Sequence, residues 1–177
     1  MKNEWQSEVS IMIDIFCKSF PAPFMLFLLY VQLFTFFPGV MLMKKLSFAS
    51  FAWGLVTYLV LFNGSDTIFK KIAGIRKLFT MKIAIFLFCL RFVNCAIYIL
   101  IAIGYKGIWF FQSDWFALLN TFIVGGINGF CTTAFFVLGP EKVESHEREK
   151  VGFLSVLGWL GGIFIGSLCA IFFEKLN

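Results

Sequence analysis

Apolar residues fall into five long runs separated by short polar segments. The runs cover residues 20–43, 46–69, 83–104, 115–138 and 151–173. Each is close to the ~20 residues that a helix needs to cross ~30 Å of hydrocarbon, and none alternates with period two as a membrane strand does. The pattern predicts an all-α membrane protein. Its five transmembrane helices would occupy residues 19–173, between a cytoplasmic segment at 1–18 and an external tail at 174–177.

The composition supports this class, because 60% of the residues are hydrophobic, 20% aromatic and only 14% charged. The lipid bilayer is therefore an expected partner. The first twenty residues carry acidic side chains and lack the compact apolar core of a signal peptide. They predict an interfacial amphipathic helix with Ile11, Ile15 and Phe16 on one side. The alternative is a frayed tail.

Orientation follows from the distribution of lysine and arginine, which concentrate in cytoplasmic loops. Four basic residues fall on the external side, Arg91 lies inside a run, and ten fall on the side of the N-terminus. The ten are Lys2, Lys18, Lys70, Lys71, Arg76, Lys77, Lys82, Lys142, Arg148 and Lys150. The N-terminus is predicted to be cytoplasmic and the C-terminus external, with the plasma membrane favoured over an internal membrane. These loops explain the net charge of +5, so no nucleic-acid partner is expected.

One acidic residue, Asp66, lies near the end of the second apolar run. Lys70 follows it one helical turn later, and Asn63 precedes it by three positions. An ionisable residue within a membrane is expensive, and its presence indicates function by default. Asp66, Lys70 and Asn63 are therefore the candidate binding residues for a small polar solute. The alternative is a local ion pair at the membrane edge that holds the helix end in place.

No pattern of catalytic or metal-binding residues accompanies this site. Four of the five cysteines lie inside apolar runs at spacings that match no zinc site, so they are expected to pack. His146, the only histidine, lies in a charged loop without a nucleophile that can be placed beside it. We expect no catalytic residue, no metal, no cofactor and no enzymatic activity.

Two glycine stripes predict close helix packing. Gly158, Gly162 and Gly166 recur every four residues in the last run, and Gly125 and Gly129 form a shorter stripe in the fourth. Small residues at this spacing let two backbones approach closely. The longer stripe is expected to join the fourth and fifth helices. Such a face serves rigid packing or a gating interface equally well.

The first run contains a helix breaker, Pro38, followed by Gly39. Proline removes a backbone donor, and the adjacent glycine loosens the helix further. Bent or broken helices near the middle of the membrane recur in transporters. The alternative is a kink that only improves packing.

Three motifs in the C-terminal third resemble the equilibrative nucleoside transporters. They are Asn128-Gly129-Phe130, Gly139-Pro140-Glu141-Lys142-Val143 and Glu147-x-Glu149-x-x-Gly152. Earlier in the chain, Phe37-Pro38-Gly39, Phe62-Asn63-x-x-Asp66 and Arg91 are similar to successive helices of the same family. The order of motifs from about residue 11 to 173 is similar to the five C-terminal helices of an eleven-helix transporter.

The resemblance implies that this chain forms one half of a helical bundle related to the major facilitator architecture. Transporters of this architecture work by alternating access around a central site. Asp66 and Lys70 would face this site and bind a nucleoside or nucleobase, with Asn63 in support. Asn128, Gly129 and the long glycine stripe would serve helix packing or gating.

Two positions depart from the family, and one half of the transporter is missing. Lys70 stands where the family has arginine, which loses a planar fork of donors. Ala96 stands where a proline is expected after Arg91, so the resemblance gives Arg91 no role beyond packing. An N-terminal half or a second copy is the expected partner. The alternative function is a non-transporting membrane subunit or relic that packs against a partner membrane protein.

Overall fold

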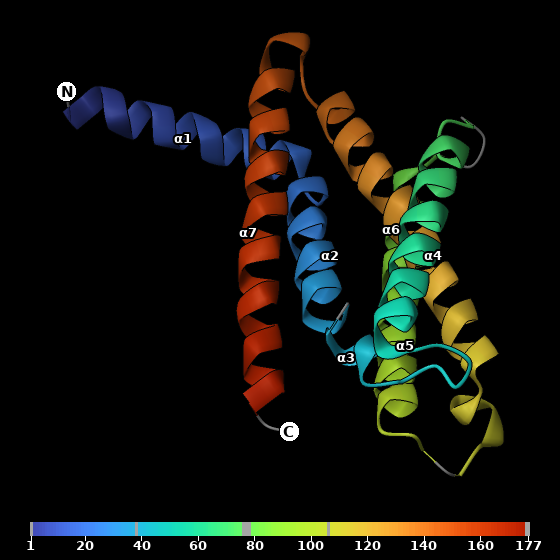
Figure 1. Ribbon diagram of the computed structural model, residues 1–177. Helices are drawn as coiled ribbons and strands as arrows, with labels where there is room; N and C mark the ends of the chain where they lie inside the picture. The colour runs from blue at the N-terminus through green and yellow to red at the C-terminus, as the bar shows by residue number, and fades with distance from the viewer. Residues whose placement is uncertain (1, 38, 76–78, 106, 176–177) are drawn as a thin grey trace.

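A computed structural model describes residues 2–37, 39–75, 79–105 and 107–175 (Figure 1). These residues form helices and turns without a strand, which confirms the all-α membrane class. The α-helices are α1 (Lys2–Ser19), α2 (Ala22–Phe36), α3 (Gly39–Leu42), α4 (Phe51–Ile72), α5 (Met81–Ala102), α6 (Asp114–Leu138) and α7 (Arg148–Lys175). Short 3₁₀ turns add η1 (Trp109–Gln112), η2 (Pro140–Lys142) and η3 (Ser145–Glu147).

Within the described residues, 3 helices are long and apolar enough to cross a membrane. They are α5, α6 with its following turn, and α7 with its preceding turn. The pair formed by α1 and α2 could add a fourth, although it is bent by 78°. α4 is not among them, and its second half carries the polar residues Asn63 and Asp66. The count of five spans stays a prediction.

The helices form two regions that lie next to each other (Figure 1). In the first region, α2 packs along α7. In the second, α4 and α5 both pack against α6. α1 projects sideways from the end of the first region, nearly at a right angle to it.

Connections that the sequence places on one side of the membrane lie at one end of the molecule (Figure 1). The start of α2, the end of α4, the start of α5 and the turn from α6 to α7 share this end. Lys142 Nζ donates to the Phe20 carbonyl there at 2.8 Å. At the opposite end, the segment between α3 and α4 joins the start of α6, where Lys44 pairs with Asp114 at 2.9 Å.

The first expected span is broken rather than continuous. α2 starts at Ala22, with Pro21 at its N-cap and Pro23 in its first turn, where the missing N–H has no helical acceptor to lose. It ends at Phe36, and Phe37 is extended, with φ −123° and ψ 132°, as expected for a residue that precedes a proline. Gly39 is the first residue of the short helix α3. Pro38 itself lies outside the described residues, so its expected role stays a prediction.

Residues 2–19 form the helix α1, and the expectation that Ile11, Ile15 and Phe16 share one side of an interfacial helix stays a prediction. Ile15 is buried against Val143 and Val151, whereas Ile11 is 38% exposed. α1 runs away from the bundle, so a residue one turn before Ile15 is beyond the reach of α7 (Figure 1).

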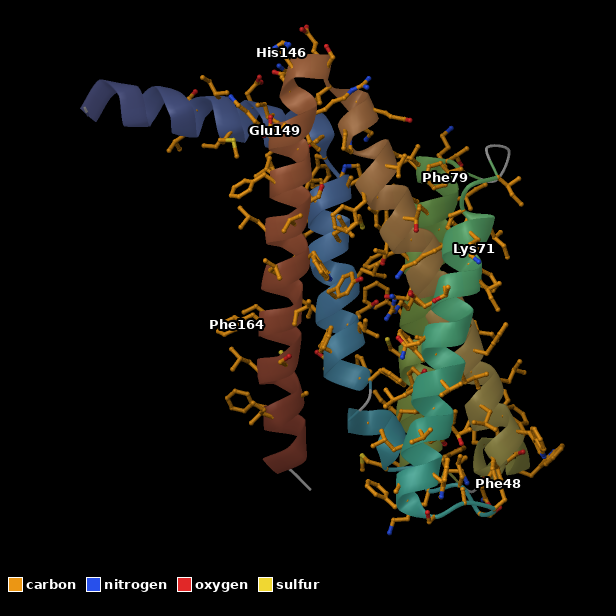
Figure 2. The ribbon with its side chains drawn as sticks, turned by 45° about the horizontal axis from the view of Figure 1, so that its top comes forward. Phe48, Lys71, Phe79, His146, Glu149 and Phe164 are labelled. Carbon is orange, nitrogen blue, oxygen red and sulfur yellow. The ribbon has the colours of Figure 1, made fainter. Side chains whose placement is uncertain are left out.

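The long glycine stripe packs on α2, and not on α6 as expected. A Cβ atom at Gly158, Gly162 or Gly166 would collide with a backbone carbonyl of α2. The carbonyls belong to Pro23, Phe27 and Val31, which recur at the same four-residue spacing. The two stripes match along their length, so α7 places its glycine face against α2 and turns larger side chains away. Phe164 is one of these, and Figure 2 shows it on the side of α7 that faces away from α2.

Candidate functional site

Asp66 is buried where α4 meets α6, with only 7% of its surface exposed. The shorter glycine stripe makes this approach possible. A Cβ atom on Gly129 would collide with the Asp66 carbonyl, and one on Gly125 would collide with the Phe62 carbonyl. The backbones of α4 and α6 therefore meet at these glycines, which brings the side chain of Asn128 within reach of α4.

A chain of polar contacts crosses three helices at this point. Arg91 Nη1 on α5 donates to Asn128 Oδ1 on α6 at 2.8 Å. Asn128 Nδ2 donates to Asp66 Oδ1 on α4 at 2.9 Å. The other carboxylate oxygen, Oδ2, pairs with Lys70 Nζ at 2.5 Å. We call these four residues the polar chain.

The polar chain is buried at one end and open at the other. Arg91 is 1% exposed and Asn128 3% exposed, whereas the Lys70 side chain is 45% exposed. A charge buried away from water is strongly unfavourable unless it is hydrogen-bonded or paired. The Asp66 carboxylate therefore has a fixed oxygen on the side of α6 and an oxygen on the side of Lys70 whose partner reaches solvent.

Asn63 is not a member of the polar chain. Its side chain is exposed, and Nδ2 donates to the Leu59 carbonyl of the same helix at 2.8 Å. The structure thus brings Asp66 and Lys70 together, whereas the hydrogen bond of the Asn63 side chain goes to the backbone of its own helix.

Two members of the polar chain were assigned to packing by the sequence. Arg91 was given no further role, and Asn128 was grouped with the packing and gating residues. Arg91 lies near the middle of α5, and Asn128 is close to the middle of α6. The rule that marks Asp66 as functional applies equally to an arginine inside a membrane helix, which needs a partner. That signal could have linked Arg91 to Asp66.

A groove of about 700 Å³ runs between α4 and α6, but Asp66 does not line it. Apart from Thr57 and Ser65, its lining is apolar or glycine: Val60, Leu61, Gly64, Ile68, Trp115, Leu118, Leu119 and Phe122. Such a surface suits lipid or another helix better than a hydrogen-bonding solute.

Catalytic and metal-binding groups do not gather among the described residues. No cluster of three or more His, Cys, Asp or Glu side chains there could hold a metal ion. His146 lies in the turn between α6 and α7 at the edge of the molecule (Figure 2), where Nδ1 is 3.5 Å from the Glu144 carboxylate. Both side chains are exposed, as expected for a solvated loop.

Comparison with known proteins shows the family of this chain. A family model described as "Nucleoside transporter" matches residues 2–175, nearly the whole chain. The chain belongs to the nucleoside transporter family. It is therefore an integral, multi-pass membrane protein of a transporter family and not an enzyme.

A curated member of the family is similar to this chain over most of its length. The chain is 29% identical over 145 residues to a protein of Arabidopsis thaliana named "Equilibrative nucleotide transporter 2". The match covers 81% of the chain and 33% of that protein, so the chain spans about a third of the length of its relative. No solved structure matches the chain.

Proposed function

We propose that this chain supplies one wall of a nucleoside-binding site in an alternating-access transporter. A site near the middle of the membrane needs two walls that move against each other. The second wall would be an N-terminal half, on the same polypeptide or another, or a second copy of this chain. The match to about a third of a longer transporter supports this proposal.

The Asp66 carboxylate is the observation that carries the proposal. Nucleosides are neutral, so their recognition depends on hydrogen bonds. Asn128 holds Oδ1 in place, whereas Oδ2 is bound by a lysine whose side chain is 45% exposed. Lys70 reaches solvent, so it can move aside when a donor of the ligand takes its place at Oδ2, which keeps the buried carboxylate hydrogen-bonded. Oδ2 then accepts a hydrogen bond from a ribose hydroxyl or a base N–H group.

A carboxylate in this setting also provides selectivity. A site built to pair a hydroxyl rejects an analogue that lacks it, because the buried acceptor is left unpaired. Lys70 keeps a positive charge next to the ligand, where the family resemblance expects arginine. Lys70→Arg should therefore keep or raise uptake, since the planar fork can make two parallel hydrogen bonds.

The test is Asp66→Asn in the chain expressed together with the N-terminal half of a family member. We expect most nucleoside uptake to be lost at unchanged membrane abundance. The neutral amide preserves shape and removes a charge-assisted acceptor worth roughly 1.5–3 kcal/mol, or about ten-fold to over a hundred-fold in affinity. Radiolabelled nucleoside uptake and surface abundance are the measurements.

The competing outcome is a purely structural ion pair. In that case Asp66→Asn would lower abundance, and adding Lys70→Met would restore it together with uptake. Unchanged uptake and affinity in the Asp66→Asn protein would rule out a ligand site here. An assembly without any saturable nucleoside uptake would favour the non-transporting subunit.

We also propose that the chain lies in the plasma membrane with the α6–α7 turn in the cytoplasm. The end of the molecule that holds this turn also holds the ends of α1 and α4, to which the sequence assigns most of the basic residues. Epitope tags at the N-terminus and between residues 76 and 82 should be protected in intact cells, and a tag at the C-terminus accessible. Both termini on one side of the membrane would remove the five-helix topology.

A further inference from the structure

Arg91 is a buried cation whose purpose the packing of α5 does not explain. The residue is 1% exposed, and Nη1 donates to the Asn128 carboxamide. Its Nε atom has no hydrogen-bond partner among the described residues. A methionine or leucine would fill the same space without the cost of removing a charge from water.

The donor and acceptor groups of Arg91, Asn128 and Asp66 determine which way the Asn128 amide faces. A guanidinium group can only donate hydrogen bonds, and an ionised carboxylate can only accept them. Asn128 stands between them and can face either way, because its two ends are similar in shape. Arg91 requires the oxygen of the amide, which leaves the NH₂ group for Asp66 Oδ1.

We infer that Arg91 acts as a positioning residue, which fixes the orientation of the Asn128 amide and through it the ionised Asp66 carboxylate. The inference rests on the proposed function, because the positioned group is the one that would bind the nucleoside. Arg91 itself is 1% exposed and does not meet the ligand. Its guanidinium group prevents the Asn128 amide from turning its oxygen toward Asp66. In that orientation the amide oxygen and the carboxylate would repel each other.

Arg91→Met, Asn128→Leu and the double variant separate positioning from structure. Each is expressed with the N-terminal half, and uptake is resolved into KM and maximal rate per molecule at the surface. Arg91→Met should raise KM roughly ten-fold or more, because the loss of a charge-assisted contact is of this size. Asn128→Leu should raise KM as well and also lower abundance, since it leaves Arg91 buried without its partner.

The double variant, Arg91→Met with Asn128→Leu, decides between the two roles. The two apolar side chains can pack against each other, and the buried arginine charge that lacked a partner is gone. Abundance should therefore return to that of the wild type. Under the positioning role, KM stays at least roughly ten-fold raised, because Asp66 Oδ1 has lost its donor. Normal abundance together with a normal KM would overturn the inference and leave Arg91 as a structural residue.

Asn94→Leu is the matched control. Asn94 is on the same helix, one turn after Arg91, and is 6% exposed. Among the described residues, its side chain donates to the Leu90 carbonyl of its own helix at 3.4 Å. Its replacement should leave KM unchanged. An equal rise of KM in the Asn94→Leu and Arg91→Met proteins would attribute the effect to general damage to α5 and contradict the inference.

A second measurement does not depend on nucleoside transport. Hydrophobic carbodiimides modify a membrane carboxyl group only after it takes up a proton. In purified chain, modification of Asp66 followed by mass spectrometry should be slow in the wild type and in Asn94→Leu, and several-fold faster in Arg91→Met. If the assembly transports no nucleoside, the proposed function fails, and this rate decides the role of Arg91. Equal rates in the Arg91→Met and wild-type chains would overturn it.

Discussion

The α2–α7 region and the α4–α5–α6 region are both packed through glycines, but the close packing has a different result in each. In both, glycines bring one helix against the backbone carbonyls of another. Between α2 and α7 the result is close packing, to which Thr35 adds a hydrogen bond to the Gly166 carbonyl at 3.5 Å. Between α4 and α6 the close approach at Gly129 also lets Asn128 reach Asp66. The comparison indicates that the first region is a scaffold and the second holds the polar chemistry.

Tyr30 connects the two regions. Its hydroxyl group on α2 accepts a hydrogen bond from Thr132 on α6 at 3.4 Å. Its ring lies edge-on to Trp159 on α7, with 5.8 Å between ring centroids. Tyr30 is therefore part of the contact between the two regions.

The strongest way to break the comparison is Gly162→Leu in the scaffold. A leucine side chain would occupy the space of the Phe27 carbonyl, so α2 and α7 must separate. Overpacking of this kind costs typically about 1–3 kcal/mol, and a forced helix separation belongs at or beyond the upper end of that range. The amount of folded protein and its melting temperature in detergent should fall, while the remaining folded protein keeps its KM.

Gly152→Leu is the control for this change. Gly152 lies on the same helix, but a Cβ atom placed there would meet no described residue within 4 Å beyond its own turn of helix. Its variant should melt like the wild type. Normal melting of the Gly162→Leu protein as well would contradict the assignment of the stripe to the contact between α2 and α7.

A smaller change, Gly129→Ala, sharpens the comparison in the second region. The added methyl group would collide with the Asp66 carbonyl and move α4 away from α6. We expect a loss of stability of about 1–3 kcal/mol and, unlike in the scaffold, a raised KM, because the bond from Asn128 to Asp66 lengthens. Melting temperature and uptake kinetics measure the two effects.

The control here is Gly64→Ala on α4, where nothing lies within 4 Å of the added atom. This variant should be neutral or slightly stabilised, since alanine favours helices by roughly 1 kcal/mol over glycine. A Gly129→Ala protein with an altered melting temperature and an unchanged KM would mean that the second region is a scaffold too.

The sequence predicted the helical class well, because long apolar runs have few alternatives in a membrane. It was less accurate about ends and neighbours. Pro21 delays the start of α2, and the segment before Phe51 turns back to meet Asp114 instead of forming helix. The partner of the glycine stripe was also wrong, since a stripe shows that a helix packs closely and not which helix it meets.

The candidate site was predicted only in part, for a similar reason. The distance of four residues between Asp66 and Lys70 lies within one helix, so the ion pair follows directly from spacing. Asn128 is separated in the sequence by 62 positions from Asp66 and by 37 from Arg91, the two residues that it links. Contacts of this kind depend on how helices rotate against each other, which the local pattern does not determine.

The bend between α1 and α2 couples the position of α1 to the tilt of the scaffold. α1 leaves α2 at 78°, and its end is tied to the α6–α7 turn by Lys18 and Glu147 at 3.3 Å and by the burial of Ile15. In the interfacial position that the sequence predicts for α1, the depth of this helix in the headgroup layer would depend on lipid composition. Any change in the tilt of the α2–α7 pair would swing α1 up or down through that layer. A change in the thickness or composition of the surrounding membrane would thereby change the tilt of the α2–α7 pair.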